Sequence, residues 1–429
     1  MAAAPGTKNV RALKRIGSFV ICLVLLVGLC SGFVLIHSTT FIGEKMPIWT
    51  HGPFDMDHGN YQDFLKAGSM SSIRHLAKAN KHPLVAVTYC FLGGLVYRHT
   101  DNQVTPCSLL VASGMLIFGV WLFWRANTGY ALLGVVLMGF SFAVWFNGAV
   151  LEARAAIFLG AVILLVGIDL VDKHPGVAGT AVSAFLTLPL LGFCVPNMFL
   201  LPLVPLTLIM KWKRLKFFET IRLSLLYLVL ILLLVAAGYR LMSELNPGIS
   251  LGEFVRISGF ESGKNTRCEI SHLSGENFKM TARQYLFCSL AGLLQPPTPQ
   301  PGKLGVVKDS LWLQPDLFQM YAGTVSGVLF VAAYGVVLLI LTVLAVRRKY
   351  DGHLFWILLI WMGIDIFFFT YFDPWARSPW GVEIMVPIWA IIVLGFYKLK
   401  PKLWWLLMIF AGILLWHNAA VMSYLRELY

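Results

Sequence analysis

The sequence predicts an all-α protein that crosses a membrane many times, and three observations indicate this fold class. First, 58% of its 429 residues are hydrophobic and only 13% are charged, unlike the composition of a soluble domain. Second, the mean hydropathy is +0.74, and apolar runs long enough to cross a bilayer recur along the chain. Third, basic residues cluster between these runs, as they do on the cytoplasmic side of membrane proteins. The net charge of +13 therefore indicates topology, and we expect no nucleic-acid partner.

About eleven apolar segments are predicted to span the membrane. The first, 16–42, follows a basic amino terminus and is too long for the apolar core of a signal peptide. It also lacks a convincing cleavage site, so we interpret it as a retained helix. The other ten segments are 107–124, 128–146, 155–171, 177–193, 197–210, 217–242, 319–346, 353–372, 382–397 and 403–422.

A shorter apolar segment, 84–97, is predicted not to cross. Its length falls short of the ~20 residues that a membrane helix needs, and it contains Gly93 and Gly94. Counting it as a span would place three later basic clusters outside the cytoplasm, against the positive-inside rule. As a re-entrant or interfacial helix, it leaves these clusters on the same side as the basic amino terminus. The clusters lie at 211–216, 347–349 and 398–402.

This topology divides the chain into three regions. They are a membrane module at 1–242, a large outer loop at 243–318 and carboxyl-terminal helices at 319–429. The first region includes an outer loop at 43–106. In the large outer loop, the stretch YLFCSLAGLL is apolar enough to pack on the bundle. Cys268 and Cys288 of this loop can form a disulfide in an oxidising compartment, and the sequence leaves that pairing open.

The first outer loop carries the leading catalytic candidates, Asp55 and Asp57. A carboxylate at the membrane surface can act as a general base, and two carboxylates two residues apart can also share a divalent cation. His51 and His58 could join such a site, but the spacing matches no zinc signature. We therefore assign no metal ligand and leave metal dependence open. The alternative is that these are ordinary solvated loop residues.

Charged residues near the predicted spans form a second group of candidates. Glu152 and Arg154 lie in a short outer turn, and Glu383 lies at the outer start of a span. Charges beside hydrocarbon are costly unless they are paired or placed in a cavity, so an ion pair and a substrate site are both open. Asp365 lies inside a span, and a contact to a neighbouring helix and a functional role are both open for it as well. Arg283, in the large outer loop, could bind an anionic head group.

Several catalytic motifs are missing from the sequence. It contains no P-loop, no GxSxG elbow, no HExxH and no dinucleotide fingerprint. The predicted cytoplasmic connections are also short and basic. Both observations argue against an ATP-driven pump and against a cytoplasmic nucleotide-sugar enzyme.

The order of these features resembles the GT-C superfamily of membrane glycosyltransferases, which take sugars from polyprenyl-phosphate carriers on the outer face of the membrane. The likeness rests on Asp57 followed by Tyr61 in DHGNYQDFLKAG. It rests also on KHPLVAVTYCFLGGL, with His82 and Pro83, which is similar to the start of the family's non-crossing helix. The likeness covers the first half of the chain and, more weakly, the rest. It departs from the family where a second acidic residue often follows the aspartate, because His58 stands there.

The resemblance implies an inverting transferase with its active site outside the cytoplasm. We expect a bacterial inner membrane because the outer loops are compact and contain no Asn-x-Ser/Thr site. Asp57, or else Asp55, would deprotonate the acceptor hydroxyl, and Glu152 would be a second acidic residue. The donor would be a polyprenyl-phosphate-linked sugar and the acceptor a glycan, lipid or protein, with no certain cofactor. The residues expected to contact substrate are His58, Tyr61, His82, Arg154, Arg283 and Glu383.

Two other functions remain open on the sequence. A polysaccharide ligase or polymerase would also use lipid-linked intermediates, but would place its catalytic loop late in the chain, as 243–318 would allow. A secondary transporter would use Asp365 and the helix interruptions at Pro189 and Pro196. Against transport, the sequence shows no pair of matching halves.

Overall fold

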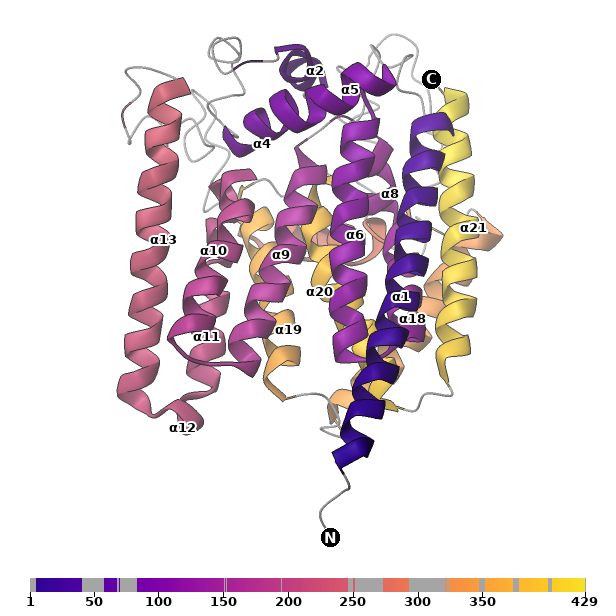
Figure 1. Cartoon of the computed structure of the whole chain (residues 1–429). Coiled ribbons are helices and arrows are strands. Elements are labelled where there is room, and N and C mark those ends of the chain that lie inside the picture. The colour runs from indigo at the N-terminus through magenta and orange to yellow at the C-terminus, as the bar shows by residue number, and fades with distance from the viewer. Residues whose placement is uncertain are drawn as a thin grey trace.

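The computed structural model describes residues 5–40, 58–67, 69, 83–149, 151, 153–193, 195–245, 250, 273–292, 321, 324–346, 352–372, 378–399 and 403–428. Every secondary-structure element in these ranges is a helix, and the long helices stand side by side in one bundle (Figure 1). Eight of the described helices are long and apolar enough to cross a membrane. The predicted class, an all-α polytopic membrane protein, is confirmed.

The eight long helices form most of the bundle. They are α1 (Pro5–Thr40), α6 (Thr105–Arg125), α9 (Arg154–Lys173), α13 (Phe217–Leu245), α18 (Val325–Val346), α19 (Gly352–Phe372), α20 (Met385–Leu399) and α21 (Trp404–Leu428). For α20, the apolar span includes the helical residues before it and runs from Gly381 to Leu399. Two segments predicted as spans, 177–193 and 197–210, form shorter apolar helices. These are α10 (Val177–Phe193) and, after a 3-10 turn η3 (Val195–Leu200), α11 (Leu203–Met210).

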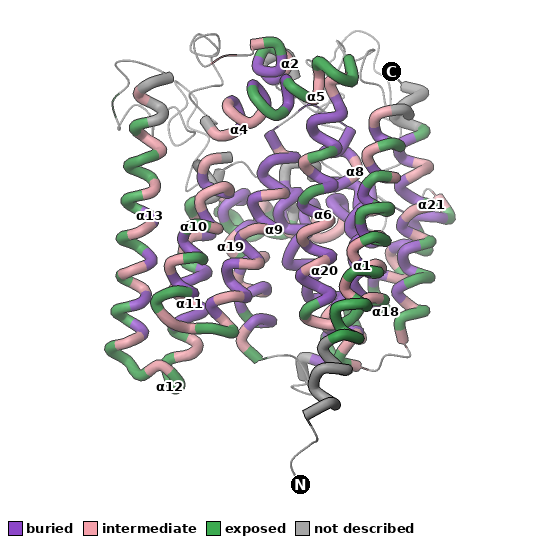
Figure 2. The backbone as a smooth tube through the Cα atoms, viewed as in Figure 1, coloured by how far each residue is buried: buried purple, intermediate pink, exposed green. Residues whose placement is uncertain are grey.

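The helices differ in how much of their surface other helices cover (Figure 2). Most of α9 and α20 is buried, whereas α1, α13 and α18 expose most of their surface. Most of the exposed side chains on these three helices are apolar, for example Val24, Leu232 and Val325 at 66%, 67% and 70% exposure. Large apolar patches on a protein surface mark contact with lipid or with another protein. In a chain this rich in apolar helices, these faces are the ones that meet hydrocarbon.

The apolar segment that was predicted not to cross lies across one end of the bundle (Figure 1). It forms α4 (Pro83–Thr88), a π-helical turn η2 (Tyr89–Gly93) and α5 (Gly94–Thr100), which pack on α2 (His58–Ala67). The Asn102 side-chain amide donates a hydrogen bond of 2.7 Å to the Ser38 carbonyl, so α6 begins where α1 ends. The chain between α1 and α6 therefore makes no net passage through the bundle.

Two glycines explain how closely α2 approaches this segment. A Cβ on Gly93 would lie 2.7 Å from Leu65 Cδ2, and one on Gly94 would lie 2.8 Å from the Leu65 carbonyl oxygen. The buried ring of Tyr61 adds edge-on contacts to Phe64 and Tyr89, with centroids 5.7 and 5.8 Å apart. The helix α2, within the first outer loop, is thus fixed on the non-crossing segment by close packing.

The predicted span 128–146 is two helices, α7 (Thr128–Phe140) and α8 (Phe142–Ala149), bent by 67° at Ser141. The N–H groups of Phe142 and Ala143 donate hydrogen bonds of 2.9 Å to the carbonyls of Leu290 and Ser289. Irregular backbone at membrane depth is tolerated where the protein itself satisfies its polar groups. The break is therefore stabilised by a segment distant in sequence.

That segment, the turn after η6 (Gln284–Cys288), is part of the bundle although it lies within the predicted large outer loop. Asn418 on α21 donates hydrogen bonds to the Phe140 and Leu290 carbonyls, at 2.6 and 2.8 Å. Its side-chain oxygen accepts a hydrogen bond from the Gly292 N–H at 2.9 Å. Together with the preceding helix α15 (Gly275–Arg283), this turn packs among the carboxyl-terminal helices.

At the opposite end of the bundle, an ion-pair network joins α6, α9 and the chain after α11. Arg125 pairs with Asp169 and Asp172, and Lys211 Nζ lies 2.8 Å from Asp172 Oδ1. Lys173 Nζ lies 3.0 Å from Asp169 Oδ2. This end also carries α12 (Trp212–Leu215) and the amino terminus (Figure 1). Arg125, Lys173 and the cluster at 211–216, which the charge pattern groups on one side of the membrane, lie at this end, whereas the cluster at 347–349 lies outside the described residues.

Candidate functional site

The candidate site is a buried ionic cluster formed by Arg154, Asp365 and Glu383. Arg154 is the first residue of α9, Asp365 lies on α19, and Glu383 lies in the 3-10 turn η7 (Ser378–Ile384) that leads into α20. The two carboxylates are 4% and 0% exposed and lie close enough to interact electrostatically. Arg154 Nη1 lies 3.9 Å from Glu383 Oε1. Two parts of the chain that are far apart in sequence, the start of α9 and the neighbouring elements α19 and η7, therefore meet at this cluster.

The position of Glu383 depends on close packing around Gly381. A Cβ on Gly381 would overlap the ring of Tyr285, so only glycine fits at this point of η7. The Tyr285 ring stacks on Phe369 of α19, with centroids 4.7 Å apart and an interplanar angle of 23°. Phe369 lies one helical turn after Asp365, on the same face of α19. The packing of Tyr285 thus holds η7 against the face of α19 that carries the second carboxylate.

Several polar atoms in this region are buried without a hydrogen-bond partner in the part of the chain that the structure describes. These are both carboxylate oxygens of Glu383, Oδ2 of Asp365, and both side-chain polar atoms of Gln284, a residue that is 2% exposed. Buried polar atoms are satisfied in most native structures, and exceptions are frequent at functional sites. The region around η6 and η7 therefore has free capacity to bind a polar group.

The charges of the cluster do not balance when both carboxylates are ionised. One guanidinium offsets one carboxylate, and an uncompensated charge in a low-dielectric interior is costly. Ionisable residues within membrane-spanning segments are rare, and they mark substrate or ion pathways in many membrane proteins. The cluster is suited to bind a cationic or hydrogen-bonding group beside Glu383, or an anionic group beside Arg154.

The structure brings together two of the predicted site residues, Arg154 and Glu383. Arg283 ends α15, is partly buried and immediately precedes Gln284 and Tyr285 in the chain. The remaining predicted residues do not enter this cluster in the described part of the chain. Asp55, Asp57, His82 and Glu152 lie outside the described residues, as does His51.

Two predicted substrate contacts, His58 and Tyr61, lie on α2. His58 is the first residue of α2, and its side chain is not among those described. Tyr61 is 0% exposed, and its ring packs between Phe64 and Tyr89. Its ring therefore anchors α2 to η2, and a substrate contact at Tyr61 remains a prediction.

Sequence reasoning did not find Gln284, Tyr285 and Gly381. The sequence gives one indication of this packing. The apolar stretch YLFCSLAGLL of the large outer loop, which we predicted to pack on the bundle, begins at Tyr285. The same stretch bears on the open disulfide. Cys288 is a free thiol buried beside Tyr321, and burial raises its pKa to about 12. The structure therefore holds no disulfide at Cys288.

No metal site stands out in the described residues. No group of three or more His, Cys, Asp or Glu side chains among them could hold a metal ion. Asp55 and Asp57, which the sequence suggests as a possible cation site, lie outside these residues. Metal dependence at the first outer loop therefore stays open, as it was on the sequence.

No family model, curated protein or solved structure matches the chain. The fold and the hydropathy define its class, a polytopic all-α membrane protein with a buried ionic cluster where α9, α19 and η7 meet.

Proposed function

We propose that the protein is an integral-membrane glycosyltransferase that moves a sugar from a polyprenyl-phosphate donor to an acceptor on the extracytoplasmic face. The observation that carries this proposal is the non-crossing segment α4–η2–α5, which lies with α2 over the end of the bundle where α1 ends (Figure 1). Asp57 immediately precedes the first residue of α2 in the sequence. A lipid-linked donor keeps its tail in the bilayer, so its reacting carbon stays at the membrane surface, where this loop would meet it.

The ionic cluster is a second observation that supports the proposal. Arg154 begins α9, and α9 ends at Lys173 in the network at the other end of the bundle, so Arg154 lies toward the end that carries α2. A leaving polyprenyl phosphate develops negative charge, and a fixed guanidinium stabilises such charge best where water is excluded. Arg154 is 14% exposed and is held by Glu383, so it is preorganised for this role.

In the proposed reaction, Asp57, or Asp55 in its place, takes the proton of the acceptor hydroxyl. The hydroxyl oxygen attacks the anomeric carbon from the face opposite the phosphate. The bond between that carbon and the phosphate oxygen breaks, and the phosphate leaves with the bonding electron pair. The transfer inverts the configuration of the sugar and needs no nucleotide. A bacterial inner membrane is the proposed location, with the site facing away from the cytoplasm.

The test is transfer from radiolabelled polyprenyl-phosphate sugars, offered as a panel of hexoses and pentoses to the purified protein in proteoliposomes. Asp57→Asn should lower turnover by about 10²-fold or more, the contribution expected of a general base. Asp63→Asn is the matched control, because Asp63 is exposed on the adjacent helix α2. Undiminished turnover in the Asp57 variant, with Asp55→Asn also active, would overturn the proposed base.

A second candidate function, cation-coupled transport, is favoured by the burial of Asp365 and Glu383 near one another within apolar helices. Carboxylates in such positions carry protons or cations in many transporters. The same proteoliposomes distinguish the two functions. A transporter would accumulate solute in response to an imposed ion gradient, would lose this with Asp365→Asn, and would not depend on Asp57.

A further inference from the structure

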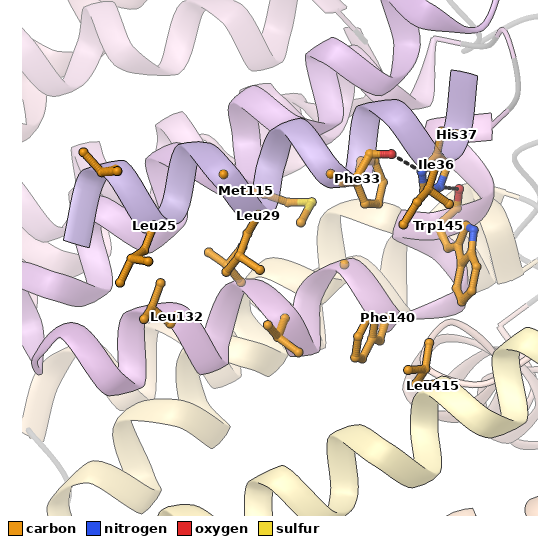
Figure 3. A pocket seen from close by; sticks show the side chains of 16 residues that line it. Leu25, Leu29, Phe33, Ile36, His37, Met115, Leu132, Phe140, Trp145 and Leu415 are labelled. Atoms are coloured by element: carbon orange, nitrogen blue, oxygen red, sulfur yellow. Dashed lines mark hydrogen bonds between the residues drawn. The ribbon is translucent and has the colours of Figure 1, made fainter. Parts of the chain in front are cut away.

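A long groove, here called the α1 groove, runs between α1, α7 and the start of α8, with α21 at one end (Figure 3). Its volume is about 770 Å³, within the range of ligand sites of about 300–1,000 Å³. Almost all of its walls are aliphatic or aromatic, including Leu29, Phe33, Met115 and Phe140. No strongly polar ligand fits such walls, because its polar groups would remain unsatisfied. The groove is suited to hydrocarbon.

The length and exposure of the α1 groove indicate what kind of hydrocarbon fits. Its α1 side extends from Val24 to His37, which at 1.5 Å per residue is about 20 Å. One leaflet is about 15 Å deep, half of the ~30 Å hydrocarbon core, so the groove is long enough for a single acyl chain and too short for a much longer polyprenyl chain. Val24 and Ile36 line the groove and are still 66% and 50% exposed, so it opens on the lipid-facing surface.

Two glycines on α1 leave the wall of the groove uncovered. Nothing lies within 4 Å of the position that a Cβ would take on Gly28 or on Gly32. The two glycines are four residues apart, so they lie on the same face of α1 and expose its backbone to the groove. A flexible chain can lie directly against that surface.

One end of the groove is polar and lies beside the non-crossing segment. There the His37 ring stacks on Phe33 and its nitrogens lie 2.7 Å from the Phe33 carbonyl and 3.1 Å from the Trp145 carbonyl (Figure 3). The next residue, Ser38, accepts the hydrogen bond from Asn102. Asn102 follows the last turn of α5, where Arg98 and His99 are exposed.

A phosphate-headed lipid has the matching chemistry. Its acyl chain would fill the apolar walls, and its phosphate would lie near Arg98, four residues before Asn102. Arginine binds phosphate well because its planar guanidinium can donate two parallel hydrogen bonds. In the same exposed stretch Arg98 carries a positive charge and Asp101 a negative one, so the phosphate is placed at Arg98 itself.

We propose that the α1 groove binds one acyl chain of an anionic glycerophospholipid, with its phosphate at the end marked by His37 and Arg98. This site does not depend on the transferase proposal, since a transporter of the same fold would bind the lipid equally. Filling the groove at α1 should displace the lipid without disturbing the protein core.

The test uses phosphatidylglycerol with a diazirine near the end of one acyl chain, incorporated in nanodiscs with the purified protein. After irradiation, peptide mass spectrometry compares labelling of α1 and α7 with labelling of α13. Gly32→Leu should lower groove labelling by about tenfold or more. The substitution adds bulk only in the groove, and leucine has the higher helix propensity, so folding should be retained.

The matched control is Gly335→Leu on α18, where a Cβ also meets nothing within 4 Å, and it should leave groove labelling unchanged. Equal labelling in Gly32→Leu and the control would overturn the site. Preferential labelling by a diazirine polyprenyl phosphate, with phosphatidylglycerol excluded, would overturn the acyl assignment.

For the head group, Arg98→Gln should remove the preference for phosphatidylglycerol over phosphatidylcholine, and an unchanged preference would overturn that placement. None of these readouts needs a sugar donor, so they are independent of transferase activity.

Discussion

Arg154 and Glu383 form an ion pair across the bundle, with Nη1 of the arginine 3.9 Å from Oε1 of the glutamate. The glutamate side chain is 1% exposed and the arginine side chain 14%. Breaking such a pair leaves a charge with little water to compensate it, so its loss is more costly than loss of a surface pair. The pair joins the start of α9 to the turn η7 and is the structural centre of the candidate site.

Glu383→Gln should destabilise the protein by about 3 kcal/mol, because it removes the carboxylate that faces Arg154 while keeping the side-chain shape. Thermal unfolding in detergent measures the effect. The control is Glu219→Gln, which removes an ion pair to Arg222 between side chains that are 35% and 65% exposed and should change stability by less than about 1 kcal/mol. If Glu383→Gln proves neutral or stabilising, the pair does not contribute to stability as described.

Gly381→Ala should destabilise the protein by about 1–3 kcal/mol and lower activity, because the added methyl overlaps the Tyr285 ring and forces η7 away from α19. The control is Gly363→Ala on α19, where a Cβ meets nothing within 4 Å and should stabilise the helix by about 0.5–1 kcal/mol. Thermal unfolding of both variants gives the comparison. Equal effects of the two substitutions would contradict the close packing of Tyr285 on Gly381.

Asn418→Ala should cost about 1–3 kcal/mol, because the buried Gly292 N–H loses its partner, while the Leu290 carbonyl keeps the hydrogen bond from the Phe142 N–H. Limited proteolysis should then cut the chain at 273–292 faster than in the wild type. Trp416→Leu on the same helix is the control, since Trp416 is 52% exposed and should be replaceable with little effect. Unchanged proteolysis in Asn418→Ala would show that this turn is held mainly by other contacts.

Thr100→Cys and Lys213→Cys should react with a membrane-impermeant maleimide from opposite sides of the membrane. Both residues are exposed, and they lie at opposite ends of the bundle, on α5 and α12. In right-side-out vesicles we expect labelling of the first, and labelling of the second only after permeabilisation. The unmodified protein gives the background from its own seven cysteines. Labelling of Lys213→Cys from outside, with Thr100→Cys labelled only after permeabilisation, would contradict the non-crossing assignment of 84–97.

The sequence predicted the fold class because apolar run length and charge are local properties of the chain. It also placed 84–97 outside the set of spans, since the basic clusters at 211–216 and 347–349 would otherwise lie on the wrong side. It selected Arg154 and Glu383 for a related reason, the cost of a charge next to hydrocarbon. The fold class and the two charged residues need only the residue and its immediate surroundings, and the placement of 84–97 needs the order of charges along the chain; none needs a contact between distant segments.

Other features depend on contacts between distant segments. The segment 128–146 reads as one span, yet it bends by 67° because the carbonyls of Ser289 and Leu290 accept hydrogen bonds from the start of α8. Likewise, a tyrosine in a predicted outer loop gives no sign that its ring fills the space beside Gly381.

The sequence by itself thus determined that the chain is an all-α membrane protein, which segments are apolar, and which charged residues are costly enough to warrant a functional role. Only the tertiary structure decided that Arg154 meets Glu383 near Asp365, and that Tyr285 and Gly381 hold these groups in place. Hydrophobicity sets where a helix can lie, because transfer to lipid acts on each segment separately. Which helices meet is set by side-chain packing and by the need to satisfy buried polar groups between segments, and neither can be read from one segment alone.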